Sequence, residues 1–179
     1  SVMWEAGDKV SLVFKKSPSD AFVGEFTADI GNGTSANATF LGGVATDVTG
    51  DNGYADAGLA VYPSTAVDAQ TGKVIFNLPS DQYAKAGGSG SFEQHLNLSS
   101  SVVSLADIKD DQHAEAKFRN ALSVLRFNLS SDVESVVISA EKPLAGKPAA
   151  MRISDDKDSP GRLLVDGAEW KEPSERVTL

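Results

Sequence analysis

Residues 10–14 read Val-Ser-Leu-Val-Phe and residues 22–30 read Phe-Val-Gly-Glu-Phe-Thr-Ala-Asp-Ile, and these two stretches decide the fold. In the first, Val10, Leu12 and Phe14 occupy every second position, and the second repeats the alternation. A period of two is typical of a β-strand, because successive side chains point to opposite faces of a sheet. We therefore predict two half-buried strands.

The same alternation recurs along most of the 179-residue chain. It predicts further strands within residues 36–40, 59–62, 74–78, 133–140 and 163–165, and the last residues, 175–179, look like the start of another. Turn signals rich in Gly, Asn and Asp separate these runs, as in Gly31-Asn32-Gly33 and Thr71-Gly72. Short strands with frequent turns indicate an all-β antiparallel sandwich or barrel with few or short helices. We expect residues 1–179 to form a single domain.

One stretch, residues 104–125, allows two interpretations. Ala114, Phe118, Leu122 and Leu125 are spaced as on one face of a helix. The alternation that continues beyond this stretch instead predicts a strand with a bulge near Val124. Periodicity alone does not decide between them.

Composition weighs against several classes of function. The chain has 25 acidic and 16 basic residues, hence a formal net charge of −9, which disfavours nucleic acid and anionic membrane surfaces. It has no cysteine and two histidines, His95 and His113, so thiolate and multi-histidine metal centres are excluded. No hydrolase motif such as G-x-S-x-G is present. We expect no enzyme activity, no catalytic residue and no cofactor.

The densest group of oxygen ligands comprises Asp47, Asp51, Asn52 and Asp56. Carboxylates and carbonyls on a loop suit calcium, but this spacing does not match an EF-hand, and a solvated turn has the same composition. With the nearby Tyr54, these residues make a carbohydrate-binding or calcium-dependent adhesion module the alternative function.

Four asparagines, Asn32, Asn37, Asn97 and Asn128, open N-x-[ST] triplets. In a eukaryotic secreted protein such triplets would mark glycan acceptors. In a serine-rich chain without cysteine they also arise by chance, which is the interpretation we prefer.

Several segments, taken in order, resemble the fimbrillin-like surface pilins and adhesins of Bacteroidales, of the FimA and Mfa type. The first is Trp4-Glu5-Ala6-Gly7-Asp8-Lys9-Val10, which is similar to the W-x-x-G-D opening of that family. The others are Ala38-Thr39-Phe40-Leu41-Gly42, Ala60-Val61-Tyr62-Pro63, Phe76-Asn77-Leu78-Pro79-Ser80-Asp81-Gln82, Phe118-Arg119-Asn120-Ala121-Leu122-Ser123-Val124-Leu125-Arg126-Phe127 and Leu144-Ala145-Gly146. Together they cover nearly the whole chain.

This resemblance implies a transthyretin-like β-sandwich of Greek-key type with about seven strands. It implies that residues 1–179 are the N-terminal domain of a longer, two-domain protein that is exported as a lipoprotein to the bacterial outer membrane. It also favours a strand over residues 118–129. Family members usually carry a further strand before the W-x-x-G-D segment, and its removal by a trypsin-like protease opens a groove for a neighbour's strand.

The leading hypothesis is therefore a structural or tip-adhesin subunit of a surface fimbria that joins other pilin subunits by β-strand addition, with surface glycans or proteins as further partners. The residues expected to line the acceptor groove, or else to form plain sandwich core, are Val10, Leu12, Phe14, Val74, Phe76, Leu125, Phe127 and Leu129.

Overall fold

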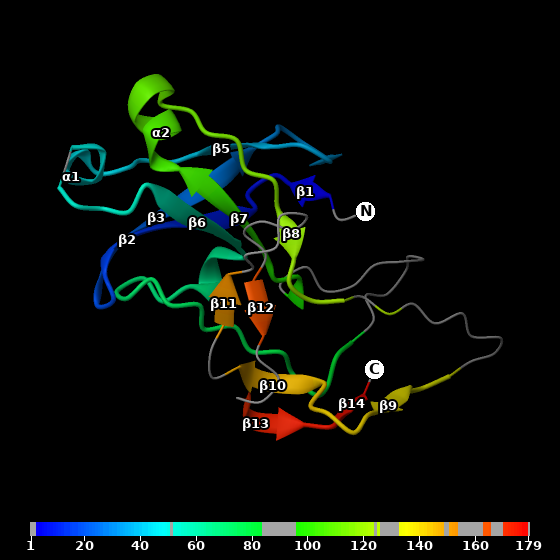
Figure 1. Ribbon diagram of the computed structural model, residues 1–179. Helices are drawn as coiled ribbons and strands as arrows, with labels where there is room; N and C mark the ends of the chain where they lie inside the picture. Colours follow the sequence, from blue (N-terminus) through cyan, green and yellow to red (C-terminus); the bar gives the residue numbers. More distant parts are fainter. Residues whose placement is uncertain are drawn as a thin grey trace.

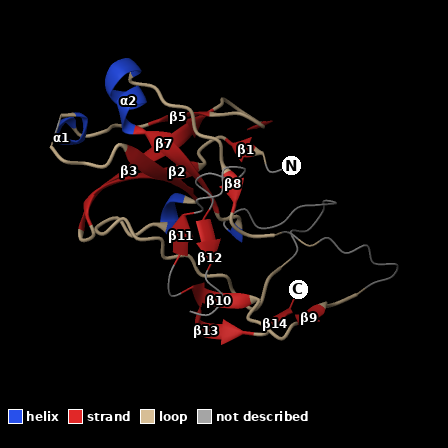
Figure 2. Cartoon of the chain, in the orientation of Figure 1, coloured by secondary structure: helices blue, strands red, loops and turns tan. Residues whose placement is uncertain are grey.

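The computed structural model describes residues 3–50, 52–83, 96–123, 125, 133–148, 151–153, 163–165 and 170–178. Strands dominate this part of the chain, and its helices are short (Figure 2). All ladders between named strands are antiparallel, and smaller strand pairs lie beside one larger sheet (Figure 1). The predicted all-β, sandwich-like fold with few or short helices is confirmed.

The larger sheet has six strands in the order β5-β3-β2-β6-β7-β8. Their bounds are β2 Lys9–Ser17, β3 Asp20–Asp29, β5 Thr39–Leu41, β6 Ala57–Tyr62, β7 Ser99–Ser104 and β8 Arg119–Asn120. β2 pairs with β3 along nearly its whole length and with β6 through Ser11, Leu12 and Val13. The first predicted strand, β2, thus lies in the middle of the sheet, and the second, β3, lies beside it.

Strand β2 is buried on both of its faces. Val10, Ser11, Leu12, Val13 and Phe14 are all buried, and Phe14 is fully enclosed. The prediction that this strand is half-buried is wrong, because both faces of the sheet are covered by other parts of the chain.

One face, which we call the helix face, carries Leu12 and Phe14 of β2. It is covered by α1 (Thr46–Thr49) through Val48 and by α2 (Leu105–Asp111) through Leu105, and both helices lie on one side of the sheet in Figure 1. The Ser104 hydroxyl accepts a hydrogen bond of 3.2 Å from the backbone N–H of Asp107, which caps α2.

The opposite face, which we call the hairpin face, carries Val13 of β2. Its cover includes the 3-10 turn η1 (Ser64–Ala66) and the hairpin of β11 (Met151–Ile153) and β12 (Leu163–Val165). The backbone N–H of Leu163 donates a 2.9 Å hydrogen bond to the hydroxyl of Ser100, which is fully buried in β7. This bond supplies a partner for a polar group inside the core.

The remaining strands form short pairs. They are β1 (Trp4–Glu5) with β4 (Thr34–Ser35), β9 (Val137–Ser139) with β14 (Arg176–Thr178), and β10 (Ala145–Pro148) with β13 (Trp170–Ser174). The expected strand near the C-terminal end is β14. Isolated bridges from Leu78 and Asp81 connect residues 78–82 to β10 and β14.

Three predictions of local structure differ from the fold. The segment 74–78 contributes isolated bridges at Val74 and Leu78 rather than a strand. In the ambiguous stretch, the helix α2 ends before Ala114 and Phe118, and the strand β8 (Arg119–Asn120) lies in the part for which the resemblance favoured a strand; residues 124 and 126–132, with the predicted bulge, are outside the described residues. The strand β7 was not predicted, because its first half is the serine run Ser99-Ser100-Ser101.

Two glycines of the sheet give space to the aromatic rings of the helix face. A Cβ atom at Gly58 of β6 would lie 2.5 Å from Cε1 of Phe14, and one at Gly24 of β3 would lie 2.7 Å from Cζ of Phe22. Neither distance is possible for real atoms. The rings therefore lie directly over backbone that has no side chain.

We predict that Gly58→Ala lowers the free energy of unfolding by about 1–3 kcal/mol, because the enclosed Phe14 ring has no space into which to move. Urea unfolding followed by circular dichroism measures the loss. Gly43→Ala is the matched control, since a Cβ there meets nothing within 4 Å. Adding Phe14→Leu to Gly58→Ala should cost less than the sum of the two single changes; full additivity would contradict the steric explanation.

Candidate functional site

The described members of the predicted groove set lie on opposite faces of the sheet. Val10, Leu12 and Phe14 are buried on the side of the helix face, whereas Phe76 is buried in the hairpin-face cluster and Val74 packs against that cluster. These residues therefore do not line one common groove; Val10, Leu12, Phe14 and Phe76 belong to the core, which was the other interpretation of the set.

Of the last three members of the set, Leu125 ends the ambiguous stretch and the other two lie beyond it. Leu125 is 64% exposed. Phe127 and Leu129 lie outside the described residues, so their part of the prediction stays open.

The acidic segment is organised as a hydrogen-bonded turn. Asp47 lies in α1, its carboxylate accepts a hydrogen bond from the Tyr54 hydroxyl (3.2 Å), and its backbone carbonyl accepts one from the Asn52 side-chain amide (2.8 Å). The Asp56 carbonyl accepts from the backbone N–H of Leu105, and Asp51 is outside the described residues. Among the residues that are described, no group of three or more His, Cys, Asp or Glu could hold a metal ion.

The N-x-[ST] triplets differ in accessibility. Asn97 is only 5% exposed, so it cannot accept a glycan in the folded chain. Asn32 and Asn37 are exposed, and Asn128 lies outside the described residues. Of the histidines, His113 is exposed and His95 is not described.

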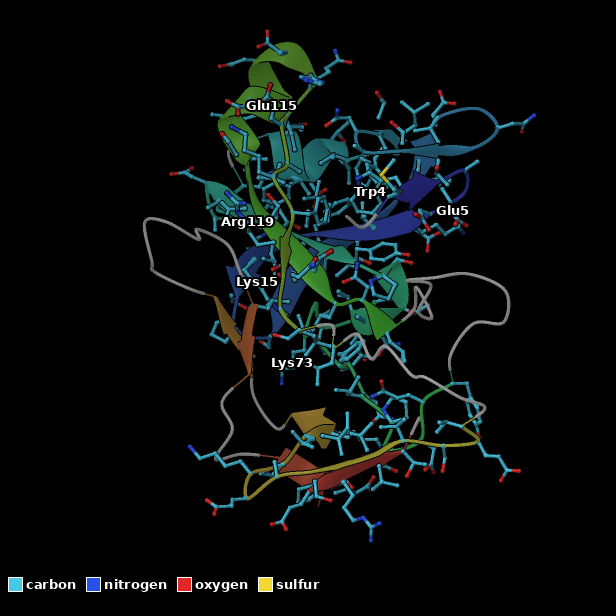
Figure 3. The ribbon with its side chains drawn as sticks, turned by 90° about the vertical axis from the view of Figure 1, so that its right-hand side faces the viewer. Trp4, Glu5, Lys15, Lys73, Glu115 and Arg119 are labelled. Carbon is cyan, nitrogen blue, oxygen red and sulfur yellow. The ribbon has the colours of Figure 1, made fainter. Side chains whose placement is uncertain are left out.

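The W-x-x-G-D segment forms a tight turn before β2. The Asp8 carboxylate accepts the backbone N–H of Glu5 (2.8 Å), and the Asp8 N–H donates to the Glu5 carbonyl (3.1 Å). Gly7 has a φ of +85°, which favours glycine at this position. Figure 3 labels Trp4 and Glu5 on β1, which this turn joins to β2. The W-x-x-G-D spacing is therefore the one that this turn requires, and the turn positions Trp4.

Trp4 is the centre of an aromatic cluster. Its ring lies edge-to-face with Phe40, Tyr62 and Phe118, at centroid distances of 4.9, 5.1 and 5.1 Å. Such edge-to-face pairs stabilise packing beyond simple burial. The cluster connects β1 to β5, to β6 and to the segment that precedes β8.

A partly buried hydrogen bond joins this cluster to Asp8. The Tyr62 hydroxyl, on a residue only 5% exposed, donates to the second carboxylate oxygen of Asp8 at 3.1 Å. Burial, followed by the negative charge of Asp8, holds the pKa of Tyr62 well above its ordinary value. Asp8 therefore fixes both its own turn and the ring that contacts Trp4.

An open edge of the large sheet is the feature best suited to binding. β5 pairs with β3 only at residues 27–29. Within the described part of the chain, residues 20–26 of β3 have no strand partner on the side away from β2. An unpaired row of backbone groups is a template for another strand.

The chain leaves this edge at Gly42. A Cβ atom there would lie 2.8 Å from the carbonyl oxygen of Glu25 and 2.6 Å from the ring of Phe26, so only glycine permits this close crossing. The following residues then turn onto the helix face, where Val44 and Val48 pack. They consequently do not continue the ladder along β3.

The direction of the unpaired groups follows from the register. Ala28 faces the start of β2, because its N–H donates to Asp8 (2.8 Å) and its carbonyl accepts from Gly7 (3.4 Å). Peptide groups along a strand alternate in direction, and the pairing of β2 with β3 is regular between Val10 and Phe14. Val23, an odd number of residues from Ala28, therefore points its N–H and carbonyl toward the open edge.

Comparison of the chain with protein-family models, with curated proteins and with solved structures gave no match. Among the described residues, no helix is long and apolar enough to cross a membrane. The geometry of the chain itself therefore carries the functional argument.

We predict that Tyr62→Phe lowers the free energy of unfolding by about 1–2 kcal/mol at neutral pH, because the Asp8 carboxylate loses a partner. The folded protein keeps the Tyr62 proton that an unfolded chain releases near pH 10, so this part of its stability falls as pH rises above about 10. Urea unfolding of both proteins at neutral pH and near pH 10.5 tests this. The difference between them should shrink at the higher pH, and a difference that grows would contradict the assignment.

Proposed function

We propose that the chain is a structural subunit of a bacterial surface fimbria and that it binds a neighbouring subunit by adding a strand to the open edge of β3. The observation that carries this proposal is the stretch of β3, residues 20–26, that has no partner strand in the described chain. The ordered resemblance to fimbrillin-like proteins of Bacteroidales supports the same function.

Strand addition fits the chemistry of this edge. The backbone groups of Val23 would pair with an incoming strand and supply affinity, while the alternating side chains of that strand would set its register. Its residues would lie beside Phe22 on the helix face and Val23 on the hairpin face, both of which are half-buried and pack against core clusters. The partner segment is therefore an extended strand with apolar residues on both sides.

The turn made by Trp4 and Asp8 gives the resemblance a physical basis. A W-x-x-G-D sequence in which Gly7 adopts a positive φ and Asp8 bonds both Glu5 and Tyr62 is a structural device that fixes β1 against the sheet. The strand that the turn holds in place is β1, which precedes β2 in the sequence. Localisation at the bacterial surface and export as a lipoprotein belong to the same proposal.

Proline at position 23 tests the proposed edge. Val23→Pro removes the outward N–H, which β2 does not use, and edge strands tolerate proline at such positions. Val23→Ala is the matched control, because it shortens the same side chain but keeps the N–H. In the source bacterium, we expect Val23→Pro to abolish fibres seen by electron microscopy with antibody labelling, and Val23→Ala to retain them.

Immunoblotting and thermal unfolding must show that the two variants are exported and folded to the same extent. Wild-type fibre numbers in the Val23→Pro strain would contradict the assignment to this edge. Wild-type cells on which the antibody labels no fibre would contradict the fimbrial function itself.

A further inference from the structure

The exposed loop before β4 contains an Asn-Gly pair in a reactive setting. Asn32 is exposed, and no hydrogen bond of its side chain is found within the described chain. The following Gly33 has a φ of +120°, and a Cβ placed on it would meet nothing within 4 Å. The Gly33 N–H likewise has no hydrogen-bond partner among the residues described.

A second Asn-Gly pair, Asn52-Gly53, provides a contrast within the same chain. Its residues are also exposed, and Gly53 also has a positive φ of +80°. The Asn52 side-chain amide, however, donates a 2.8 Å hydrogen bond to the carbonyl of Asp47 in α1. Its backbone N–H is also bonded, to the Gly50 carbonyl at 2.6 Å. The second asparagine is therefore tethered and the first is not.

We propose that Asn32 is a site of non-enzymatic deamidation in the folded protein. The Gly33 backbone nitrogen loses its proton and attacks the side-chain carbonyl carbon of Asn32. A nitrogen–carbon bond forms, the bond to the side-chain amide nitrogen breaks, and ammonia leaves with the proton. Water then opens the cyclic imide at either carbonyl, which gives aspartate or isoaspartate.

The two pairs should react at different rates for a physical reason. Ring closure requires the asparagine side chain to rotate toward the next backbone nitrogen, and Gly33 presents no side chain that would obstruct this approach. At Asn52 the same rotation first breaks the bond to Asp47. Each product at position 32 places a new carboxylate two residues before Thr34, the partner of Glu5 in the ladder of β1 and β4.

The test compares the two asparagines in one sample. The whole chain is incubated at mildly alkaline pH, either folded or in concentrated urea, and is then digested with chymotrypsin, which cuts after Phe40 and so separates the two sites. Mass spectrometry measures deamidation, and isoaspartate-specific methylation identifies the product. The Asn32→Gln variant shows whether the deamidation signal comes from Asn32, because Asn37 lies in the same fragment and could also deamidate.

In the folded chain, Asn32 should deamidate roughly fivefold to tenfold faster than Asn52, the factor expected when one hydrogen bond must break first. In urea the two rates should become similar, mainly through acceleration at Asn52. Equal rates in the folded chain, or a folded-state signal that persists in Asn32→Gln, would overturn the proposal.

Discussion

The structure depends on burying both faces of β2. Its five consecutive residues 10–14 are all buried, although Ser11 is polar and the strand begins and ends in lysine and serine. The sheet requires a cover on each face, because Leu12 and Phe14 lie on one face and Val13 lies on the other, and apolar surface left in water costs free energy in proportion to its area. The helices cover one face, and η1 with the β11 and β12 hairpin covers the other. Phe14 is enclosed only because Gly58 lets its ring lie directly on the neighbouring strand.

That requirement also explains the open edge. The residues that would extend β5 along β3 are instead used on the helix face, where Val44 and Val48 pack, and Gly42 is the point at which the chain departs. The residues that follow β5 can either cover the core or continue the ladder along β3, but they cannot do both. The buried apolar contacts are made, and the backbone groups of Val23 are left at the edge.

Much of the central sheet could be predicted from the sequence, because β2 and β3 contain runs with a period of two and β6 contains the short apolar run 59–62. The strand β7 could not be predicted, since a run of serines looks like a loop. Its buried Ser100 hydroxyl accepts a hydrogen bond from Leu163, which lies far along the sequence. The spacing of Ala114, Phe118 and Leu122 left a helix and a strand both open; the helix forms earlier, at α2, where Ser104 provides a cap, and a short strand, β8, begins at Arg119.

The candidate site was harder to predict, because it too depends on contacts between segments that are far apart in the sequence. Its groups are assembled by pairing between distant segments: the Tyr62 hydroxyl meets Asp8 across the sheet, and the edge of β3 is defined by where β5 stops. The W-x-x-G-D motif could be recognised as a pattern, but no pattern states which atoms Asp8 bonds. The groove residues were grouped by hydrophobicity, which does not distinguish the two faces of a sheet that has an apolar cluster on each side.

An edge that accepts one strand must also refuse others, and the charges along β3 suit this demand. Asp20 lies at the open end of the strand, whereas Asp29 lies where β5 covers the edge. Glu25, on the hairpin face, accepts hydrogen bonds from Lys9 (2.6 Å) and from the Ser64 hydroxyl (3.1 Å). The Lys9 hydrogen bond holds the pKa of Glu25 below its ordinary value, so this carboxylate stays charged in mildly acidic solution. Because Lys9 compensates the charge of Glu25, the charges that oppose pairing of β3 with its own copy are those of Asp20 and of the whole chain, whose net charge is −9. Under the proposed function, the partner strand is therefore a segment other than β3, with neutral or basic residues facing these carboxylates.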